Sequence, residues 1–585
     1  MQKRIVLLFF ITSFAFAQTE QLAQNYFDKG AFAKALPLYE ELFQKNSYNS
    51  LFYNQLLNCY QQLQQFEQAE NLIENQLKKT KQPQNYVLLG YLYQLQKQPT
   101  KADKYYSLAI EGLNENPNYV YAVAQTFEQK VLLEWALRAY ETAYQKNNSF
   151  NFDYQIALLQ GQLGKIDVMI DKLLDFSLAQ PAGIQSVKNQ FLYYMTTETE
   201  SQFIPMLKKA LLIRVQKNQA IFWNEYLSWL FVQQKEYDKA FVQEKAIFKR
   251  TSENLGAIIQ LANIASAEGQ NQTAEEIFTY ILENTTDTFT KIEAHTFILE
   301  QKALKTTHYE ELITEIDGVL AQFNKSETIE IQLLKAHILA FHLSKTTDAL
   351  ALLNPLLEAN IYPPLKAQVK LKMAEIYRFN EKFNQAILLF AQVEDEQKNS
   401  ELGQKAQFEM AKTSYFKTDF EWALQQVKAL KSATSQLIAN DALQLFLLIN
   451  DNIQDDSLKV AITQFAKADF LLLKNKKTEA LEGFKQILAQ HKGESIEDET
   501  LLKIGQIYDN QNNTTEALLY FDKILNEQKE SVYTDEALFY TAEIYYKKLN
   551  LPEKAKEFYE KIVLNHPDSI FFVEAQQNYR KIRGN

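Results

Sequence analysis

Histidines are the first side chains to examine for chemistry, because pairs of them on one helix face can hold zinc. The spacing that does so is four residues, one turn of helix. No two histidines of this sequence stand four residues apart, and His337 and His342, which are five apart, are expected on different faces of a helix. The sequence therefore predicts no metal site. The six histidines are His295, His308, His337, His342, His491 and His566.

Carboxylates and the single thiol are the other reactive groups. Glu375, Asp469 and Glu543 fall at equivalent positions of the repeats described below and could form an acid/base pair, although solvated helix faces carry many such residues. Cys59 has no basic neighbour and is expected to be a small, unreactive core residue. With only 14 glycines, the chain offers no phosphate-binding loop or nucleophile elbow. We predict a non-catalytic protein without a cofactor.

The composition indicates which elements position these side chains. The chain has 585 residues but only 14 Gly and 11 Pro, where average usage would give roughly 70 together. Sandwiches, barrels and wound sheets need many tight turns, which these residues supply. Since 46% of the residues are hydrophobic, the chain has enough apolar material for a core. An all-α fold is predicted.

Charge limits the classes of partner. The chain carries 61 basic and 72 acidic residues, a formal net charge of −11, and the two signs alternate along the sequence. Binding to nucleic acid or to anionic lipid requires clustered Lys and Arg. We therefore expect protein partners, with no nucleic acid and no direct membrane insertion.

The first seventeen residues have the layout of a secretory signal. Lys3 and Arg4 precede the uncharged run 5–16, and Ala15 and Ala17 form a small-x-small cleavage site. The run is shorter than the roughly 20 residues that span a bilayer. Cleavage is expected after Ala17. A lipid anchor would need a cysteine directly at the cleavage point, but the only cysteine, Cys59, lies 42 residues past Ala17. A lipid anchor is therefore not expected, and the protein is predicted to be exported.

A repeat of small residues determines the architecture. The equivalent positions Ala23, Leu57, Gly90, Ala124 and Ala157 stand 34, 33, 34 and 33 residues apart. Aromatic residues and a second alanine follow at fixed offsets in the first four units, and the weaker fifth unit has Met169 where the alanine is expected. The pattern resembles the tetratricopeptide repeat, most closely over the third unit, from Leu89 through Gly90, Tyr93, Ala102 and Tyr106 to Ala109. The resemblance implies an all-α solenoid, a right-handed superhelix of about fourteen helix hairpins.

The regularity of the repeats divides the chain. An N-terminal array is expected over 18–180, a divergent helical middle over 181–365, a C-terminal array over 366–569, where several steps lengthen to 37 residues, and a capping helix over 570–585. In each hairpin, two helices approach closely only where side chains are small. Gly90 and Ala102 are therefore predicted to mark one crossing, and Ala517 another.

The last repeats are similar to those of bacterial envelope proteins, the outer-membrane barrel-assembly lipoprotein and the Tol-Pal coordinator. The likeness rests on His566, Pro567, Asp568 and Ser569, with Asp568 or Ser569 expected to cap a helix that starts near Ile570. It implies a periplasmic location, where a partner could hold the protein at the periphery of the outer membrane. Asp-Ser-aliphatic triplets at Ser457 and Ser569 resemble a periplasmic O-glycosylation acceptor, or else serve as helix caps.

Two groups of residues are candidates for partner binding. In tetratricopeptide proteins, fixed positions on the first helix of each hairpin line the concave face of the superhelix, and the resemblance implies the same here. Amides at these positions suit an extended peptide or a glycan, since an amide both donates and accepts; solvent-facing amides without a role are the alternative. The N-terminal candidates are Asn54, Asn58, Gln61, Gln84, Tyr91, Gln94, Tyr121 and Gln125. Gln94→Leu is expected to change stability hardly at all.

The second group is basic and aromatic. Lys405, Phe408, Lys412 and Tyr415 are expected to grip an acidic segment or an amphipathic helix, unless the aromatic rings simply pack between repeats. We predict a protein-interaction scaffold that acts in outer-membrane biogenesis or secretion. A glycan-binding protein of the outer-membrane uptake type is the alternative, and an enzyme is the third possibility.

Overall fold

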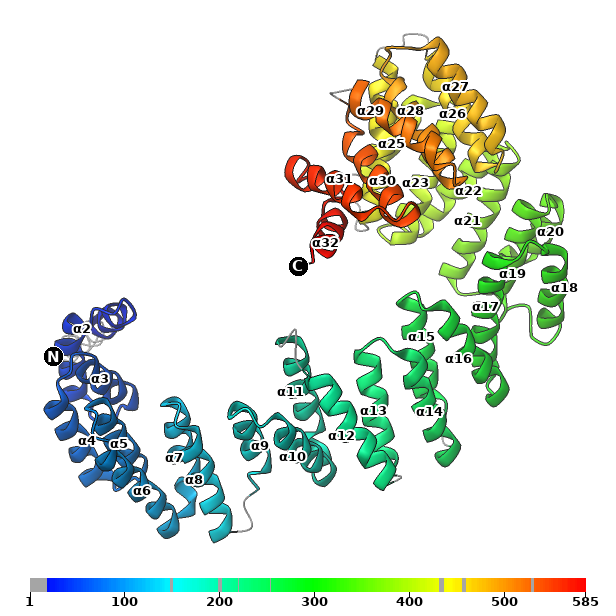
Figure 1. The fold of residues 1–585 in the computed structure, drawn as a ribbon. Coiled ribbons are helices and arrows are strands. Elements are labelled where there is room, and N and C mark those ends of the chain that lie inside the picture. The colour runs from blue at the N-terminus through cyan, green and yellow to red at the C-terminus, as the bar shows by residue number, and fades with distance from the viewer. Residues whose placement is uncertain are drawn as a thin grey trace, which may run out of the picture. The chain divides into compact units, whose positions relative to one another are not determined.

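The computed structural model describes most of the chain, and its described residues form helices and no strand (Figure 1). The predicted signal segment 1–17 and Ser457 lie outside the described residues. The described ranges are 18–147, 151–197, 202–218, 220–252, 254–430, 436–454, 459–527 and 531–584. The predicted all-α solenoid is confirmed as a fold class.

The chain divides into two compact units, Met1–Asn254 and Leu255–Asn585, and each is a stack of antiparallel helix pairs. The predicted middle segment 181–365 thus contributes to both units. Unit 1 begins with a helix at 18–28. It continues with α2 (Phe32–Lys45), α3 (Ser50–Gln62), α4 (Phe66–Thr80), α5 (Gln84–Leu95), α6 (Pro99–Glu115), α7 (Val120–Gln129), α8 (Leu133–Lys146), α9 (Asp153–Gln162), α10 (Ile166–Ala179), α11 (Ile184–Thr197), α12 (Phe203–Lys217), α13 (Ile221–Gln233) and α14 (Tyr237–Thr251).

Unit 2 follows the same plan over a longer segment. Its helices are α15 (Gly256–Ala267), α16 (Asn271–Asn284), α17 (Thr288–Lys305), α18 (Tyr309–Leu320), α19 (Ile329–His337), α20 (Thr346–Glu358), α21 (Pro363–Phe379), α22 (Phe383–Glu396), α23 (Glu401–Phe416), α24 (Phe420–Leu430), α25 (Gln436–Gln454), α26 (Val460–Leu473), α27 (Lys477–Gln490), α28 (Ile496–Asn510), α29 (Thr514–Glu527), α30 (Thr534–Glu543), α31 (Pro552–Asn565) and α32 (Phe572–Arg583).

Small residues mark the helix crossings, as predicted. A Cβ added at Gly90 of α5 would lie 2.5 Å from Cδ1 of Tyr106 and 3.0 Å from the carbonyl oxygen of Ala102, both in α6. In the C-terminal array, a Cβ at Gly505 of α28 would meet the ring of Phe521 in α29. Ala517 is fully buried beside this crossing. Only hydrogen at these two positions lets the helices approach so closely.

The turn inside a hairpin recurs with one backbone signature. In thirteen hairpins, a residue with positive φ stands two positions before the start of the second helix. Its left-handed backbone conformation ends the first helix and turns the chain into the second. Glycine or asparagine often fills this place, although Val131 does so at φ 58°. These residues are Gly30, Gln64, Lys97, Val131, Gly164, Lys235, Gly269, Ser344, Glu381, Thr418, Asn475, Asn512 and Asn550.

Two first helices end in a π-helical turn, Ile338–His342 after α19 and Ile544–Lys548 after α30. A π turn winds wider than an α turn, closing on i→i+5 bonds. It therefore brings residues five apart closer together, and the ring centroids of His337 and His342 lie 5.6 Å apart. The expectation that these two histidines face different ways was wrong for this reason.

The C-terminal helix differs in its start from the prediction. It runs over Phe572–Arg583, with Phe571 as N-cap residue and no side-chain cap bond. The hydroxyl oxygen of Ser569 instead accepts the backbone N–H of Phe571 at 3.1 Å, in the turn before the helix. The ring of Phe571 stacks on Phe539 with centroids 4.3 Å apart. This packing holds residues 570 and 571 in the turn, so the helix begins two residues late.

Candidate partner-binding surfaces

The predicted N-terminal amides lie on three successive first helices, α3, α5 and α7. On α3, Asn54 is exposed and Asn58 half-buried, whereas Gln61 is buried. Within the described part of the chain, Nε2 of Gln61 and Oε1 of Gln84 are buried without a hydrogen-bond partner. A buried polar atom left unpaired costs free energy. These two amides therefore favour a ligand with its own donors and acceptors.

Other members of this set already have partners inside the protein. Oε1 of Gln94 accepts the hydroxyl of Tyr106 at 2.7 Å, and Tyr106 is only 2% exposed. Gln94 is exposed, as expected for a solvent-facing amide, but this hydrogen bond also gives its side chain a partner inside the hairpin. The ammonium of Lys130 lies 4.8 Å from the ring centroid of Tyr91.

Tyr121 and Gln125 complete the set on α7. Both are exposed, and the Tyr121 ring is 52% exposed although one edge packs on Tyr140 and Phe152. Exposed rings of this size at the end of a row of amides are typical of contact surfaces. Within the candidate surface of unit 1, Tyr121 and Gln125 are exposed and Gln61 and Gln84 carry unpaired atoms, whereas Gln94 and Tyr91 already have partners inside the protein.

The predicted C-terminal group opens onto a cavity of about 590 Å³ in unit 2. Phe408, Lys412 and Tyr415 line it, while Lys405 is exposed on the same helix, α23. The remaining walls come from α25, α26, α28 and α30 and from Ile570 and Phe571. Three of the four predicted residues are brought together here. We call this space the C-terminal cavity.

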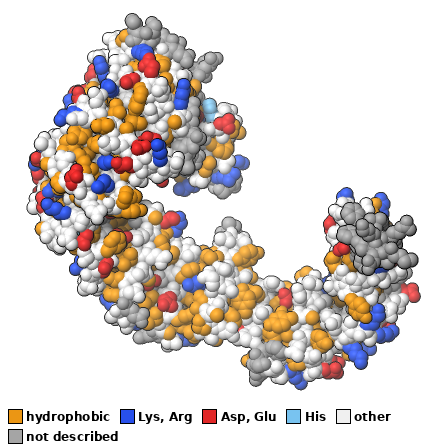
Figure 2. Space-filling view, turned by 180° about the vertical axis from the view of Figure 1, so that it is seen from behind, with side chains coloured by type: hydrophobic (Ala, Val, Ile, Leu, Met, Phe, Trp, Pro, Cys, Tyr) orange, Lys and Arg blue, Asp and Glu red, His pale blue; other side chains and the backbone are white. Residues whose placement is uncertain are grey.

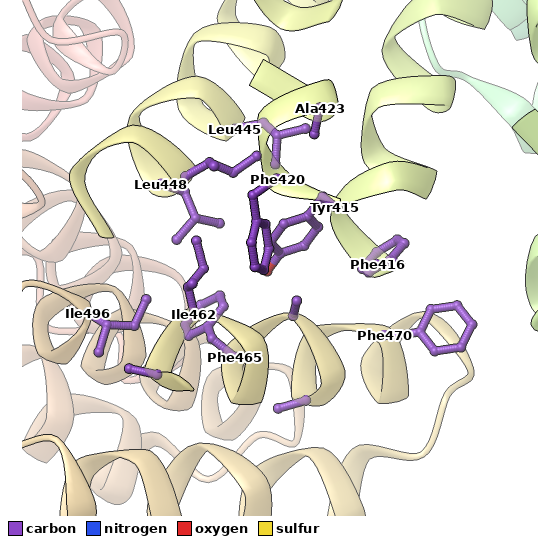
Figure 3. Packing of buried hydrophobic residues seen from close by; sticks show 14 of the residues in the cluster. Tyr415, Phe416, Phe420, Ala423, Leu445, Leu448, Ile462, Phe465, Phe470 and Ile496 are labelled. Carbon is purple, nitrogen blue, oxygen red and sulfur yellow. The ribbon is translucent and has the colours of Figure 1, made fainter. Parts of the chain in front are cut away.

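The aromatic rings at its floor belong to the core. Tyr415 is 1% exposed, and its ring lies 6.1 Å from that of Phe420 and 5.3 Å from that of Phe416. Leu445 and Leu448 of α25 belong to the same cluster, and Figure 3 shows these side chains together. The packing alternative therefore holds for these rings. Only the hydroxyl of Tyr415 stands apart, because it has no hydrogen-bond partner among the described residues.

The charge of the cavity is opposite to the prediction. Its lining holds the carboxylates of Asp441, Asp469, Glu499 and Glu536 against the ammonium groups of Lys412 and Lys503. The predicted basic patch is thus part of an acidic site. The acidic residues come from four helices, α25, α26, α28 and α30, and the distances between them in the sequence kept this grouping out of reach of pattern reasoning.

Burial shifts the pKa values of these groups. Burial and the nearby charge of Glu499 raise the pKa of Glu536 to about 7. Burial also raises the pKa of Glu499, although Lys503 and a hydrogen bond with Tyr533 act against it. For Lys503, burial alone would lower the pKa, but the charges of Asp469, Glu499 and Glu536 raise it. One lysine is thus surrounded by carboxylates.

The lysines of α23 face another carboxylate. Arg378 of α21 is 6% exposed and forms an ion pair with Glu409. Burial would raise the pKa of Glu409, but Arg378, Lys412 and Lys405 together lower it. Because Glu409 is already paired with Arg378, it offsets the positive charge of Lys405 and Lys412 only in part.

Helix α25 is an addition to the repeat plan. It follows the hairpin of α23 and α24, precedes that of α26 and α27, and packs against the first helices α23, α26 and α28. Nε2 of Gln444 on α25 donates to Glu536 on α30 at 3.3 Å. The sequence does carry a signal: the small positions Ala411 and Ala468 stand 57 residues apart, one 37-residue step plus the length of one helix.

The groups considered for catalysis do not converge. Glu375 pairs with Lys372 at 2.5 Å, and Glu543 accepts the hydroxyl of Tyr559 at 2.5 Å, while Asp469 lines the C-terminal cavity. Among the described residues, no group of three His, Cys, Asp or Glu side chains is placed to hold a metal ion. Burial raises the pKa of the Cys59 thiol to about 11.

A second cavity of about 760 Å³ lies in the earlier part of unit 2, lined by residues of α15, α16, α17, α19 and α21. Its lining includes Glu293, Glu300 and Glu330, with His337 and Lys372. Burial, together with the charges of Lys372 and His342, lowers the pKa of His337 to about 4. His337 is therefore neutral at ordinary pH.

The surface carries no large patch of one charge on the face that Figure 2 shows, where basic and acidic side chains are interspersed. Of the helices that the structure describes, none combines the length and the apolar character needed to cross a membrane.

Comparisons with known proteins agree with the hairpin geometry. Models of the tetratricopeptide repeat match residues 26–89 and 83–111 in unit 1 and residues 499–531 and 536–569 in unit 2. Both ends of the chain therefore contain tetratricopeptide repeats. None of the curated proteins matches the chain.

Solved structures show distant similarity. The structure of Naa15/Naa10 bound to HypK-THB shares 12% identity, covering 97% of this chain and 94% of that chain with a TM-score of 0.27. The tetratricopeptide domain of P58(IPK) shares 14% identity, covering 62% of this chain and 97% of that chain with a TM-score of 0.19.

Proposed function

We propose that this protein is a non-catalytic scaffold that binds partner proteins along the first helices of its repeats. The observation that carries the proposal is a subset of the buried but unpaired polar atoms on these helices, those on Gln61 and Gln84 in unit 1 and on Tyr415 in unit 2. Each lies at a position that the sequence predicts for partner contact. A bound polypeptide can satisfy such atoms through its backbone groups.

We place the scaffold in the bacterial periplasm, at work in outer-membrane biogenesis or protein secretion. Two features of the sequence support this: the signal-like layout of residues 1–17 and the likeness of the last repeats to envelope proteins. Fractionation of cells that produce the tagged protein tests the location. The periplasmic fraction should hold a chain shortened at Ala17, and a variant lacking residues 2–17 should stay in the cytoplasm.

Photo-crosslinking in living cells tests the binding function. A photoreactive phenylalanine analogue replaces Tyr121, 52% exposed on the candidate surface of unit 1, and Gln444, exposed at the mouth of the C-terminal cavity. Matched controls carry it at Tyr144 on α8 and at Leu519 on α29, which are 46% and 49% exposed but lie on second helices. Discrete crosslinked envelope proteins are expected at the first two sites only. Equal crosslinking at all four sites, or none at any, would overturn the proposal.

A further inference from the structure

The C-terminal cavity of unit 2 has the chemistry of a site for a cation. We propose that it binds a basic side chain, Lys or Arg, that a partner polypeptide presents. This inference rests on the proposed scaffold function and adds to it the chemistry of the recognised group.

The first argument is the surplus of negative charge. Four carboxylates face two ammonium groups in the cavity lining, and Lys503 alone stands among three of the four, Asp469, Glu499 and Glu536. Carboxylates collected in a partly buried space also repel one another: burial is the main cause of the raised pKa values of Glu499 and Glu536, and neighbouring carboxylates add to it. A second cation beside Lys503 would remove part of that repulsion. The cavity therefore favours a cation over an anion.

The second argument is independent of charge. Tyr415 is 1% exposed and lines the cavity, and its hydroxyl has no hydrogen-bond partner in the described ranges. The carboxylates of Asp469 and Glu499 exert the strongest charge effects on this hydroxyl, and both are hydrogen-bond acceptors. The hydroxyl oxygen of Tyr415 and these carboxylates are acceptors that a further donor could occupy beside Lys412 and Lys503. Ammonium and guanidinium groups carry three and five N–H donors and no acceptor.

The walls suit the stem of such a side chain. Leucines 445, 448, 472, 473 and 502 and the rings of Phe408, Phe416 and Phe571 provide apolar surface beside the carboxylates. Lys and Arg bury their methylene stems along apolar surface, and aromatic faces attract the charged head. Tyr533 and Tyr540 place two further rings at the acidic end, near Glu499 and Glu536.

Two features favour a polypeptide over a metal ion or a small free amine. In the described part of the chain, no three carboxylates converge as metal ligands, and Lys503 already interacts electrostatically with Asp469, Glu499 and Glu536. The cavity of about 590 Å³ is in the size range of sites for drug-sized ligands, so residues beside the basic one enter with it. The mouth carries the exposed Asp441 and Gln444 of α25, which can contact a backbone.

Peptide binding to the full mature chain tests the inference. The probes are a blocked nine-residue peptide with one central Arg between leucines, the same peptide with neutral citrulline in place of Arg, and free agmatine. The Arg peptide should bind, the citrulline peptide roughly ten- to hundredfold more weakly, because hydrogen bonds to charged groups contribute most, and agmatine more weakly than the Arg peptide. Equal binding of the first two would overturn the cationic site, and agmatine binding as tightly as the peptide would overturn the polypeptide ligand.

Matched variants locate the binding in the cavity. Glu499→Gln should weaken the Arg peptide by roughly tenfold or more, and Tyr415→Phe by about two- to tenfold, since it removes one acceptor. Glu557→Gln makes the same change of charge on an exposed position of α31 and should have no effect. If Glu499→Gln does not fold, Tyr415→Phe still tests the site. This change removes only a hydroxyl that has no hydrogen-bond partner among the described residues, so the variant should fold. Unchanged affinity in Tyr415→Phe would refute the site.

The outcome can be separated from that of the scaffold proposal. Failure of the Arg peptide to bind, with discrete crosslinks still formed at Tyr121, would end the inference about the cavity and leave the scaffold function in place. Loss of all crosslinks would instead end the scaffold proposal, on which this inference rests.

Discussion

A single methyl group should have opposite effects at two glycines of unit 2, and this contrast tests the hairpin geometry. Gly505 lies in the middle of α28, where a Cβ would stand 2.8 Å from Cδ1 and 2.9 Å from Cζ of Phe521. Gly318 lies in α18, where a Cβ would meet no atom within 4 Å in the described part of the chain. Both glycines are helical, so the change in helix propensity has the same sign at both.

The magnitudes follow from two opposing terms. Replacing a helical glycine by alanine gains up to about 1 kcal/mol from propensity, so Gly318→Ala should stabilise α18 by up to that amount. At Gly505 the methyl also overpacks the core, at a cost of about 1–3 kcal/mol. The ring of Phe521 cannot yield easily, since it is fully buried and stacks on Tyr540 with centroids 5.7 Å apart. Gly505→Ala should therefore destabilise the hairpin by up to about 2 kcal/mol.

Hydrogen exchange measured by mass spectrometry suits this test, because a long array of repeats opens locally. Amides of α28 and α29 should exchange faster in Gly505→Ala, and those of α18 more slowly in Gly318→Ala. In a Phe521→Leu background the Gly505→Ala change should lose its penalty, since the ring that it strikes is gone. Slower exchange of α28 in Gly505→Ala alone would show that the two helices do not cross at this glycine.

Three further outcomes are expected. Gln94→Leu should destabilise the hairpin of α5 and α6 by about 1 kcal/mol, since the buried Tyr106 loses its acceptor; hydrogen exchange of α6 unchanged from wild type would contradict this. Val131→Gly should stabilise the turn before α8 by about 1–2 kcal/mol, because a β-branched residue there holds φ at 58°, and a lower melting temperature would count against it. The folded-state pKa of Glu536, about 7, exceeds the unfolded value, so its contribution to stability is full below about pH 4.5 and is lost as the pH rises through 7. It amounts to at most about 3.5 kcal/mol; the gain in melting temperature from pH 8 to pH 5 should shrink in Glu536→Gln, and an equal gain in both proteins would refute it.

The C-terminal cavity shows how far pattern reasoning reaches into a site. Phe408, Lys412 and Tyr415 were found because they repeat at fixed positions of one helix, and they do line the cavity. The nature of the site was misjudged because the carboxylates opposite them stand on other helices. Asp441 on the inserted α25 and Glu536 on α30 are 95 residues apart, and only stacking brings both to one space. Charge read along one helix therefore gave the wrong sign.

The sequence by itself determined the hairpins, since the spacing of Gly90, Ala102 and Gly505 depends on local sterics: two helices can cross only where a side chain is nearly absent. The tertiary structure alone decided the rest. It brought His337 and His342 together through a π turn and paired Gln94 with Tyr106. Each of these depends on how helices wind and stack in three dimensions, and electrostatic and hydrogen-bond energies follow those distances and not the order of residues in the chain.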